Sequence, residues 1–584
     1  MFEKRKILTY LTRAAATAVL VAGLCACGQG GGEVTDVTTS GTVAVPDTVT
    51  TVAPVTTEAP SAVLVENGAS DYVVITPRSV SAEITAATRE FISDLEKKSG
   101  VKLKLYPESW AETDCEIVVG YVRDREESAA LMVKTDYTSW SVSQSGKKFF
   151  VNAYDAEGVE RGLDALMACI AEQDGKWVVT GDVQAGGTAW KDHTIPVCES
   201  RSSTVAGLYA CGEESLEVCL RSVMAEEYTA YGATLTEAGW VKYTDNQMAN
   251  NLFATYTNEA LGKTIHLGYY PTLHSGTLRI ISEPTGYLPP VEVPAYTRVV
   301  DTTFAQLKRQ TVETNAAPGM SYVMQVADGS FIIVDGGPAS TSDSTALMTY
   351  LEQLTPAGQK PTVAAWIITH SHSDHMGLAN DFLNLYHDRI DVKMAIYNFP
   401  TYEAVMDAQD ANANYLVRID TFIGTIKKYW PEAEHFVFHA GQTLTIADAE
   451  IEFLFTHEDQ YPMEFSWINH TSIAFRITAG GKNVMLLGDC EKTICQQMAA
   501  TFGAYLKSDM LQLSHHGNNG ASLDLYEWID PEICFWACSQ RTFETDEKRL
   551  GTLSGYEFNA YLRNEKIRVR THYHNSVTTV IPMS

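Results

Sequence analysis

Apolar positions recur with two different periods from about residue 62 onward, and the two periods alternate along the first part of the chain. Strand-like runs are short and rich in Val and Ile, whereas helix-like stretches repeat apolar residues every three or four positions. The pattern predicts helices at residues 82–99 and 157–173, strands at residues 72–76, 101–106 and 115–120, and a hairpin at residues 139–153. This order indicates a small α/β domain over residues 63–188.

A second small domain, of α+β type, is expected over residues 189–294. The pattern there predicts a helix at residues 213–231, followed by strands at residues 241–243, 251–257, 263–270 and 277–282. A helix packed on an antiparallel sheet accounts for this order. The segment shows no constellation of reactive side chains, and the prolines at positions 289, 290 and 294 mark its end.

The first 62 residues follow a different pattern. Positive residues up to Arg13 precede an apolar stretch at residues 14–24, which is shorter than the ~20 residues needed to span a bilayer. Residues 1–26 are therefore expected to be a secretion signal. The sequence Leu24-Cys25-Ala26-Cys27 resembles a bacterial lipobox, which implies lipidation of Cys27; an ordinary cleaved signal with incidental cysteines is the alternative.

Residues 27–62 are rich in Thr, Pro and Gly and contain few large apolar side chains. Such a segment cannot bury enough surface to offset its chain entropy, so it is expected to be a linker. Together with the predicted lipid on Cys27, it places the folded part outside the cytoplasm, anchored to a bacterial cell membrane. No later segment is apolar enough to span a membrane.

Composition excludes some classes of function. The chain carries 43 Lys and Arg against 72 Asp and Glu, for a formal net charge of −29. Proteins that bind long nucleic acids neutralise phosphates with clustered basic residues, so DNA or RNA wrapping is not expected. The 11 cysteines have no regular spacing and do not indicate a disulfide scaffold.

The candidate chemistry lies in residues 295–584, which contain twelve of the 15 histidines. A buried strand is predicted at residues 363–369, and His370, His372, Asp374 and His375 follow directly after it. A loop at the end of a strand can turn these imidazole and carboxylate groups toward two neighbouring points. Nitrogen and oxygen ligands of this kind suit zinc or manganese.

This H-x-H-x-D-H pattern resembles that of the metallo-β-lactamase superfamily. The resemblance implies an αββα sandwich for residues 295–584, with Asp335 at the end of an opening hairpin beneath the metal site. Further phrases follow in the family's order: Asn469-His470, a strand ending in Gly488-Asp489, and a strand ending in His515-His516-Gly517. The last two are similar to phrases in the nuclease-like domain of bacterial competence proteins and in surface teichoic-acid phosphorylcholine esterases.

The resemblance implies two divalent ions, zinc with manganese as the alternative. One ion would be held by His370, His372 and His470, the other by Asp374, His375 and His515, with Asp489 bridging them. Either His515 or His516 could be the ligand; His515 is preferred, which leaves His516 free to contact substrate. Asp374, His516 and His572 are the expected catalytic residues. The isolated residues His387, His435, His439 and His457 are expected to be surface or packing residues.

Two such ions would lower the pKa of a water molecule from 15.7 to about 7, so the site is expected to support hydrolysis. Between residues 297 and 584 there are 20 Lys and Arg against 34 Asp and Glu, a balance of −14. A small or cell-wall-linked phosphodiester therefore fits better as substrate than long nucleic acid. The alternatives are a nuclease like the competence-protein domains, and a cell-surface glycan-binding protein whose metal site is not catalytic.

Overall fold

The computed structural model describes residues 62–584, except residues 79, 133–135, 182, 189–194, 201–202, 213, 310–318, 461–465, 519, 539–558, 563–569 and 573–577. The predicted signal, the linker and Cys27 lie outside these residues. Within them, no helix is both long enough and apolar enough to cross a membrane. The nine cysteines in the described part of the chain are all free.

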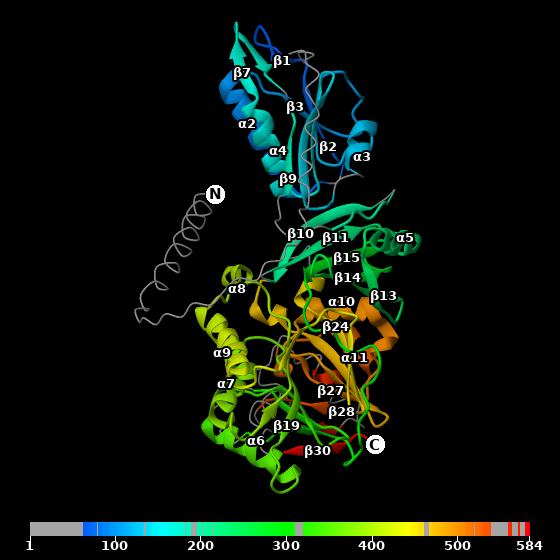
Figure 1. Cartoon of the computed structure of the whole chain (residues 1–584), viewed down its shortest axis with the longest axis vertical. Helices are drawn as coiled ribbons and strands as arrows, with labels where there is room; N and C mark the ends of the chain where they lie inside the picture. Colours follow the sequence, from blue (N-terminus) through cyan, green and yellow to red (C-terminus); the bar gives the residue numbers. More distant parts are fainter. Residues whose placement is uncertain are drawn as a thin grey trace, which may run out of the picture. The chain divides into compact units, whose positions relative to one another are not determined.

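Residues 62–188 form a mixed six-stranded sheet and a small antiparallel three-stranded sheet, together with three helices (Figure 1). Its six-stranded sheet has the order β3 (Lys104–Pro107), β2 (Val73–Thr76), β4 (Glu116–Val119), β6 (Lys148–Ala153), β5 (Ser139–Ser145) and β9 (Ala185–Thr188). A three-stranded sheet has the order β1 (Ala62–Val65), β8 (Lys176–Val179) and β7 (Ile170–Gln173). The helices are α2 (Ala82–Ser99), α3 (Glu126–Met132) and α4 (Ala156–Ala168).

Two predicted helices in this part of the chain had different outcomes. The helix at residues 82–99 is confirmed, since α2 has these bounds and is capped by the Ser81 side chain and by Gly100 at φ +73°. The helix at residues 157–173 is wrong at its end, because α4 stops at Ala168. Residues 170–173 instead form β7, whose antiparallel pairing with β8 competes successfully with continued helix.

Residues 204–284 form a six-stranded antiparallel sheet and helix α5 (Ala225–Glu237). The strand order is β10 (Thr204–Gly212), β11 (Ser215–Arg221), β15 (Thr277–Pro284), β14 (Lys263–Tyr270), β13 (Asn251–Asn258) and β12 (Val241–Met248). The last four strands were predicted from the sequence. The helix predicted at residues 213–231 is wrong in its first half, because β11 is buried between β10 and β15 and this pairing outweighs helix propensity; residues 225–231 are helical and belong to α5.

Residues 303–582 contain two facing sheets with helices on their outer faces, as an αββα sandwich requires. The first sheet has the order β22 (Glu434–Val437), β21 (Met394–Tyr397), β19 (Thr362–Ile367), β18 (Phe331–Asp335), β17 (Ser321–Gln325), β16 (Thr303–Gln306) and β30 (Thr579–Pro582), and β20 (Asp391–Val392) pairs with β19. The second has the order β23 (Thr443–Ile446), β24 (Ala449–Phe455), β25 (Ala474–Ala479), β26 (Lys482–Leu486), β27 (Met510–Gln512), β28 (Ile533–Phe535) and β29 (Arg570–His572).

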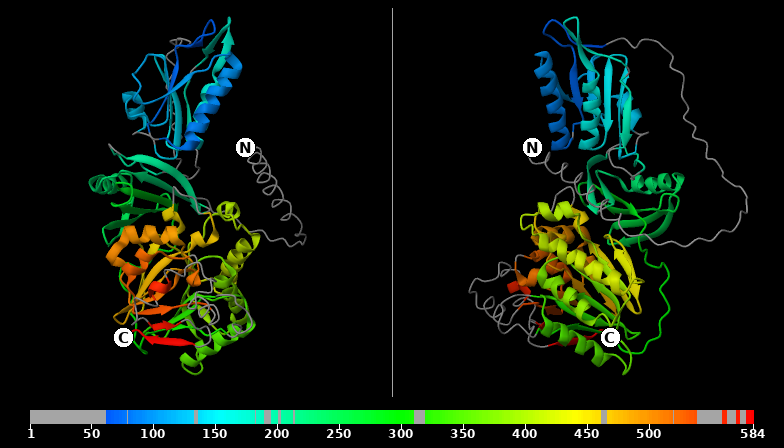
Figure 2. Two further views of the ribbon diagram at one scale, coloured as in Figure 1. Left: turned by 180° about the vertical axis from the view of Figure 1, so that it is seen from behind. Right: turned by 60° about the vertical axis from the view of Figure 1, so that its left-hand side comes forward.

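Three apolar layers hold this sandwich together. One core fills the space between the two sheets and includes Tyr322, Phe453 and Phe475. A second lies under α6 (Thr341–Leu354), α7 (Ser373–Tyr386) and α9 (Ala413–Tyr429), and a third under α10 (Lys492–Phe502) and α11 (Leu523–Ile529). The two groups of helices lie on opposite faces in Figure 1 and again in Figure 2. The predicted α/β class and the αββα sandwich are confirmed.

Candidate metal centre

The metal-ligating residues predicted from the sequence lie at one edge of the sandwich. Strands β18 and β19 are parallel in one sheet, and β26 and β27 are parallel in the other. Their carboxyl ends lead into Asp335, His370, Asp489 and His516 respectively. Crevices at the carboxyl ends of parallel strands are the usual binding sites of α/β sheets.

Helix α7 brings two more groups to this edge. It begins directly after His372, so that Asp374 and His375 lie in its first turn. A carboxylate in the first turn interacts favourably with the positive end of the helix dipole. The four residues of the sequence motif thus lie in the loop at residues 368–372 that follows β19 and in the first turn of α7.

The first cluster of ligand atoms is formed by His370, His372 and Asp489. The His370 ring is fully buried, and its Nδ1 lies 3.2 Å from the hydroxyl oxygens of Thr369 and Ser472. Its Nε2 lies 3.8 Å from Oδ2 of Asp489 and has no hydrogen-bond partner among the described residues. A buried, unpaired imidazole nitrogen beside a carboxylate fits a metal ligand, because a metal ion would satisfy both groups.

The second cluster is formed by Asp374, His375 and His516. Nε2 of His516 lies 3.3 Å from Oδ2 of Asp374 and 3.3 Å from Nε2 of His375. Oδ1 of Asp489 lies 3.2 Å from Nε2 of His375 and 3.6 Å from Nε2 of His516. The two oxygens of Asp489 therefore face the two clusters separately, as a bridging carboxylate would.

The other ring nitrogens of His375 and His516, their Nδ1 atoms, each have a hydrogen-bond partner. Nδ1 of His375 lies 2.8 Å from Oδ2 of Asp335, and Nδ1 of His516 lies 2.8 Å from the backbone oxygen of Ala537. Metal-ligating histidines usually donate their other N–H to a carboxylate or a carbonyl, which fixes the ring and its tautomer. Asp335 thus lies beneath the site, as the resemblance implied.

Burial and charge act together on the protonation of these groups. Burial, reinforced by the neighbouring His375, holds the pKa of His370 well below its usual range, so its ring is neutral. Burial opposes ionisation of Asp489, but the surrounding His375, His516 and His515 outweigh it, and the pKa of Asp489 lies well below its usual range. Neutral imidazole and ionised carboxylate are the forms that bind metal ions.

The structure corrects the choice between the two adjacent histidines. His516 occupies the position expected for His515, while Nε2 of His515 lies 3.8 Å from the other oxygen of Asp489 and 3.2 Å from Nδ2 of Asn469. Both histidines have left-handed backbone conformations, with φ of +49° and +56°. This tight turn after β27 decides which ring faces the cluster, and such strain is typical of functional sites.

His470 does not join the clusters as predicted. Its Nε2 lies 3.3 Å from Oε2 of Glu491, and its Nδ1 accepts a hydrogen bond from the backbone of Ser466. The preceding residue, Asn469, is the one that reaches His515. The histidine at position 470 suggested a ligand, but the short helix at residues 468–471 turns its ring toward Glu491 instead.

Two further residues complete the description of the predicted site. His372 lies 3.2 Å from Oδ2 of Asp410, a partner that sequence spacing could not indicate, because Asp410 follows another helix. The backbone of His572 pairs in register with Phe535 on the neighbouring strand, and its side chain lies outside the described residues.

One side of the centre is open to solvent. The side chains of Asp374, His515 and His372 are 24%, 21% and 19% exposed, whereas those of His375 and His516 are at most 1% exposed. Arg418, whose Nη1 donates to the backbone oxygen of Ser371 at 3.0 Å, lies near enough for the Asp374 charge to act on it. The site thus combines buried ligands with an open rim that carries a cation.

Comparison with known proteins agrees with this geometry. Residues 314–529 match the sequence family described as the metallo-beta-lactamase superfamily. No curated protein sequence matches the chain significantly.

Several solved structures are similar to parts of the chain. They include the metallo-beta-lactamase fold protein YhfI from Bacillus subtilis, with 14% identity over 48% of this chain and 100% of that chain, at a TM-score of 0.29. A putative metal-dependent hydrolase from Parabacteroides distasonis has 14% identity over 55% of this chain and 98% of that chain, at a TM-score of 0.25. CmlA, a diiron beta-hydroxylase from Streptomyces venezuelae, has 13% identity over 52% of this chain and 55% of that chain, at a TM-score of 0.28. At such low scores none of these likenesses assigns an activity, and it is the family match that places residues 314–529 in a metallo-β-lactamase superfamily domain.

Proposed function

We propose that this protein is a metal-dependent hydrolase that cleaves a small or cell-wall-linked phosphodiester outside the cytoplasmic membrane. The observation that carries the proposal is the position of Asp489, whose two oxygens face separate clusters of ligand atoms. A structural metal site is normally closed around one ion by four ligands. Two clusters that share a carboxylate and keep an open rim suit catalysis instead.

The residues that would hold the ions are His370 and His372 on one side, and Asp374, His375 and His516 on the other, with Asp489 between them. Two bound divalent ions supply Lewis acidity and lower the pKa of a water molecule to about 7. The exposed carboxylate edge of Asp374 is placed to orient that water by accepting a hydrogen bond. His515, on the open rim, is placed to hydrogen-bond an oxygen of the substrate, the role first expected of His516.

Charge supports a small anionic substrate. Arg418 is half-buried beside Asp374, and its guanidinium carbon lies 5.2 Å from the centre of the Tyr415 ring. A fixed cation at the rim can bind a phosphate oxygen that the metal ions do not contact. The −14 balance of residues 297–584 would repel a long polyanion, which favours a short substrate over DNA.

Location is part of the proposal. The n-region, the short apolar stretch and the lipobox-like sequence ending at Cys27 support export and lipid anchoring, and the Thr/Pro-rich linker would give the folded part reach above the membrane. A hydrolase held in this way would meet wall-linked phosphodiesters, such as teichoic-acid decorations, at short range.

The test is hydrolysis of bis(p-nitrophenyl) phosphate by the purified protein with zinc or manganese. We expect activity that is lost on chelation and falls by a factor of about 10³ or more in Asp489→Ala and His370→Ala. His387→Ala, at the far end of α7, is the matched control and should keep full activity. The proposal is contradicted if the protein is inactive with both metals, or if neither site variant changes its activity. Parallel assays with plasmid DNA and a chromogenic β-lactam should show little turnover.

A further inference from the structure

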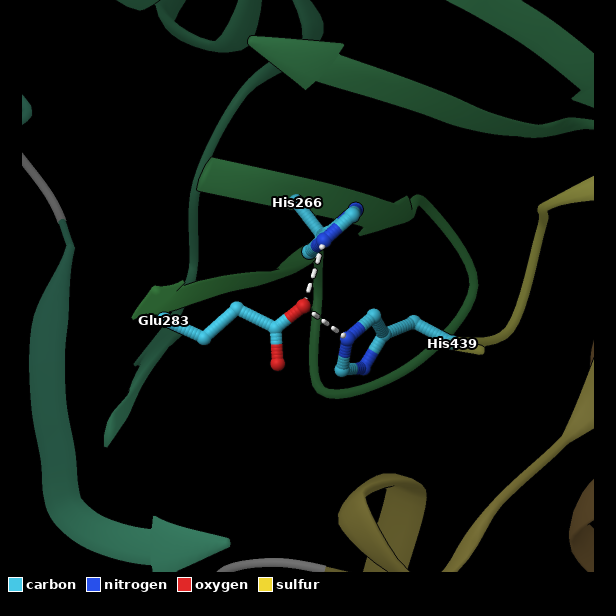
Figure 3. A group of neighbouring side chains, drawn as sticks. All are labelled: His266, Glu283 and His439. Carbon is cyan, nitrogen blue, oxygen red and sulfur yellow. Dashed lines mark hydrogen bonds and ion pairs between the residues drawn. The ribbon is translucent and has the colours of Figure 1, made fainter. Parts of the chain in front are cut away.

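A third cluster of metal-ligating side chains lies away from the centre on Asp489. It consists of His266 on β14, Glu283 on β15 and His439, which follows β22 (Figure 3). The sequence indicated no reactive constellation in the segment that holds His266, and His439 was expected to be a surface or packing residue. Instead, both imidazoles are more than nine-tenths buried and point toward the same carboxylate oxygen.

The distances within this cluster are slightly shorter than those between ligands of one tetrahedral ion. Oε1 of Glu283 lies 3.1 Å from Nε2 of His266 and 3.1 Å from Nε2 of His439. Zinc bonds to nitrogen and oxygen ligands are about 2.0–2.2 Å long, so neighbouring ligand atoms of a tetrahedral zinc site are about 3.3–3.5 Å apart. Movements of a few tenths of an ångström would admit an ion between the three atoms.

The other nitrogen of each ring is already held, as metal-binding histidines require. Nδ1 of His439 lies 2.9 Å from Oε2 of Glu458, and Nδ1 of His266 lies 3.3 Å from the hydroxyl of Thr255. Glu458 is fixed in turn by the Thr456 hydroxyl at 2.7 Å. Both rings therefore present their Nε2 atoms to a common point with their orientations set from behind.

A route for an ion and a place for a fourth ligand exist beside the cluster. A cavity of about 330 Å³ is lined by His266, Thr255, Gly441 and Gln442. Glu283 itself is 14% exposed, the most of the three ligands. A water molecule from this cavity could complete four-fold coordination.

We propose that His266, Glu283 and His439 form a third metal site, separate from the centre on Asp489, which binds zinc with water as its fourth ligand. The ion links strands β14 and β15 of the antiparallel sheet to the segment between β22 and β23 of the sandwich. Its proposed role is to link these two parts of the chain, because its protein ligands come from both of them.

The contacts of the two imidazole rings determine how many protons are released when a metal ion binds at this cluster. In the absence of metal, His439 faces carboxylates through both nitrogens and carries a proton on each. Binding of a divalent ion displaces the Nε2 proton of His439 to solvent, while the Nδ1 proton stays on the ring and is donated to the Glu458 carboxylate. In His266 the proton moves to Nδ1, toward Thr255. One proton is released for each ion bound.

The experiment uses cobalt and zinc binding to the full chain, in an Asp489→Ala background that disables the bridged centre. We expect Asp489→Ala to bind one tightly held cobalt ion with the visible absorption of tetrahedral coordination. Adding Glu283→Gln or His266→Gln should weaken this binding by a factor of at least about 100. Adding His435→Gln, on the neighbouring strand β22, should leave it unchanged. Zinc should raise the melting temperature of Asp489→Ala but not that of Asp489→Ala with Glu283→Gln.

The proposal is overturned if the Asp489→Ala protein is folded by circular dichroism and binds no cobalt. It is also overturned if Glu283→Gln and His266→Gln leave cobalt affinity and spectrum unaltered. In either case the cluster is a hydrogen-bonded network only. These results are independent of phosphodiesterase activity, since the readouts are metal affinity, spectrum and melting temperature.

Discussion

Oδ2 of Asp335 lies 2.8 Å from Nδ1 of His375, and the other oxygen of Asp335 accepts a hydrogen bond from the backbone of Thr369 at 2.8 Å. The carboxylate thus connects the end of β18 to the loop and helix that supply metal ligands. It fixes the His375 ring and increases its basicity toward a metal ion.

The Asp335→Asn variant tests this link. An amide of the same shape cannot accept the Nδ1 proton as strongly, so we expect metal affinity of the bridged centre to fall 10- to 100-fold. Asp381→Asn, on the same helix as His375 but away from the centre, should bind metal normally. Competition with a chromophoric chelator measures both. An unchanged affinity in Asp335→Asn would mean that this contact only supports folding.

The neighbouring residues His515 and His516 form a natural matched pair. Because His516 is 1% exposed and contacts Asp374, while His515 is 21% exposed at the rim, His516→Ala should lose one bound ion per chain. His515→Ala should keep its metal content and lose activity through kcat or KM. Metal analysis after dialysis distinguishes them. The reverse pattern would restore the assignment suggested by the sequence.

Helix α7 depends on Phe382, which is fully buried and contacts the Trp366 ring at a centroid distance of 5.5 Å. Phe382→Ala should destabilise the sandwich by about 3–5 kcal/mol, through lost burial and an unfilled cavity. Leu385→Ala, on the same helix at 48% exposure, should cost about 0.5 kcal/mol or less. Denaturant unfolding monitored by Trp fluorescence compares them. Equal effects would show that α7 is not anchored by this core.

Glu458 provides a prediction for pH. Burial opposes its ionisation, but His439 and hydrogen bonds outweigh burial and lower the pKa of Glu458 to about 2. Since this pKa lies below the unfolded value, about 4.3, the ionised group stabilises the fold above about pH 4.3, and this contribution is lost as pH falls toward 2.

The Glu458→Gln variant removes that contribution. In metal-free protein, the free energy of unfolding of the wild type should exceed that of the variant most above pH 5, and the difference should shrink toward pH 2. Exposed Glu527→Gln serves as the control. Urea unfolding at several pH values gives the comparison, and a difference that grows on acidification would contradict the argument.

Some of this site could be predicted from the sequence because ligands directly follow apolar strands. The apolar run at residues 363–369 predicted a strand, which is observed as β19, so His370 and the residues after it could be placed at a sheet edge. Asp489 follows a similar run. The choice of His516 over His515 could not be predicted, because it depends on two consecutive left-handed backbone conformations, which are uncommon for residues other than glycine.

The third cluster, of His266, Glu283 and His439, could not be predicted for another reason. Glu283 and His439 are 156 positions apart, and only the packing of the antiparallel sheet against the sandwich brings them together. No local spacing records such a contact. The first half of the helix predicted at residues 213–231 failed similarly, because strand β11 is specified by its neighbours β10 and β15 and not by its own helix-favouring residues.

The central claim is that two metal ions share the Asp489 carboxylate. Anomalous diffraction from crystals of the zinc-loaded protein tests it most directly. Data collected on both sides of the zinc absorption edge should show two peaks flanking the Asp489 carboxylate. One should lie beside His370 and His372, and the other beside Asp374, His375 and His516. A single peak at Asp489, or no peak there in crystals soaked with zinc, would contradict the two-metal account.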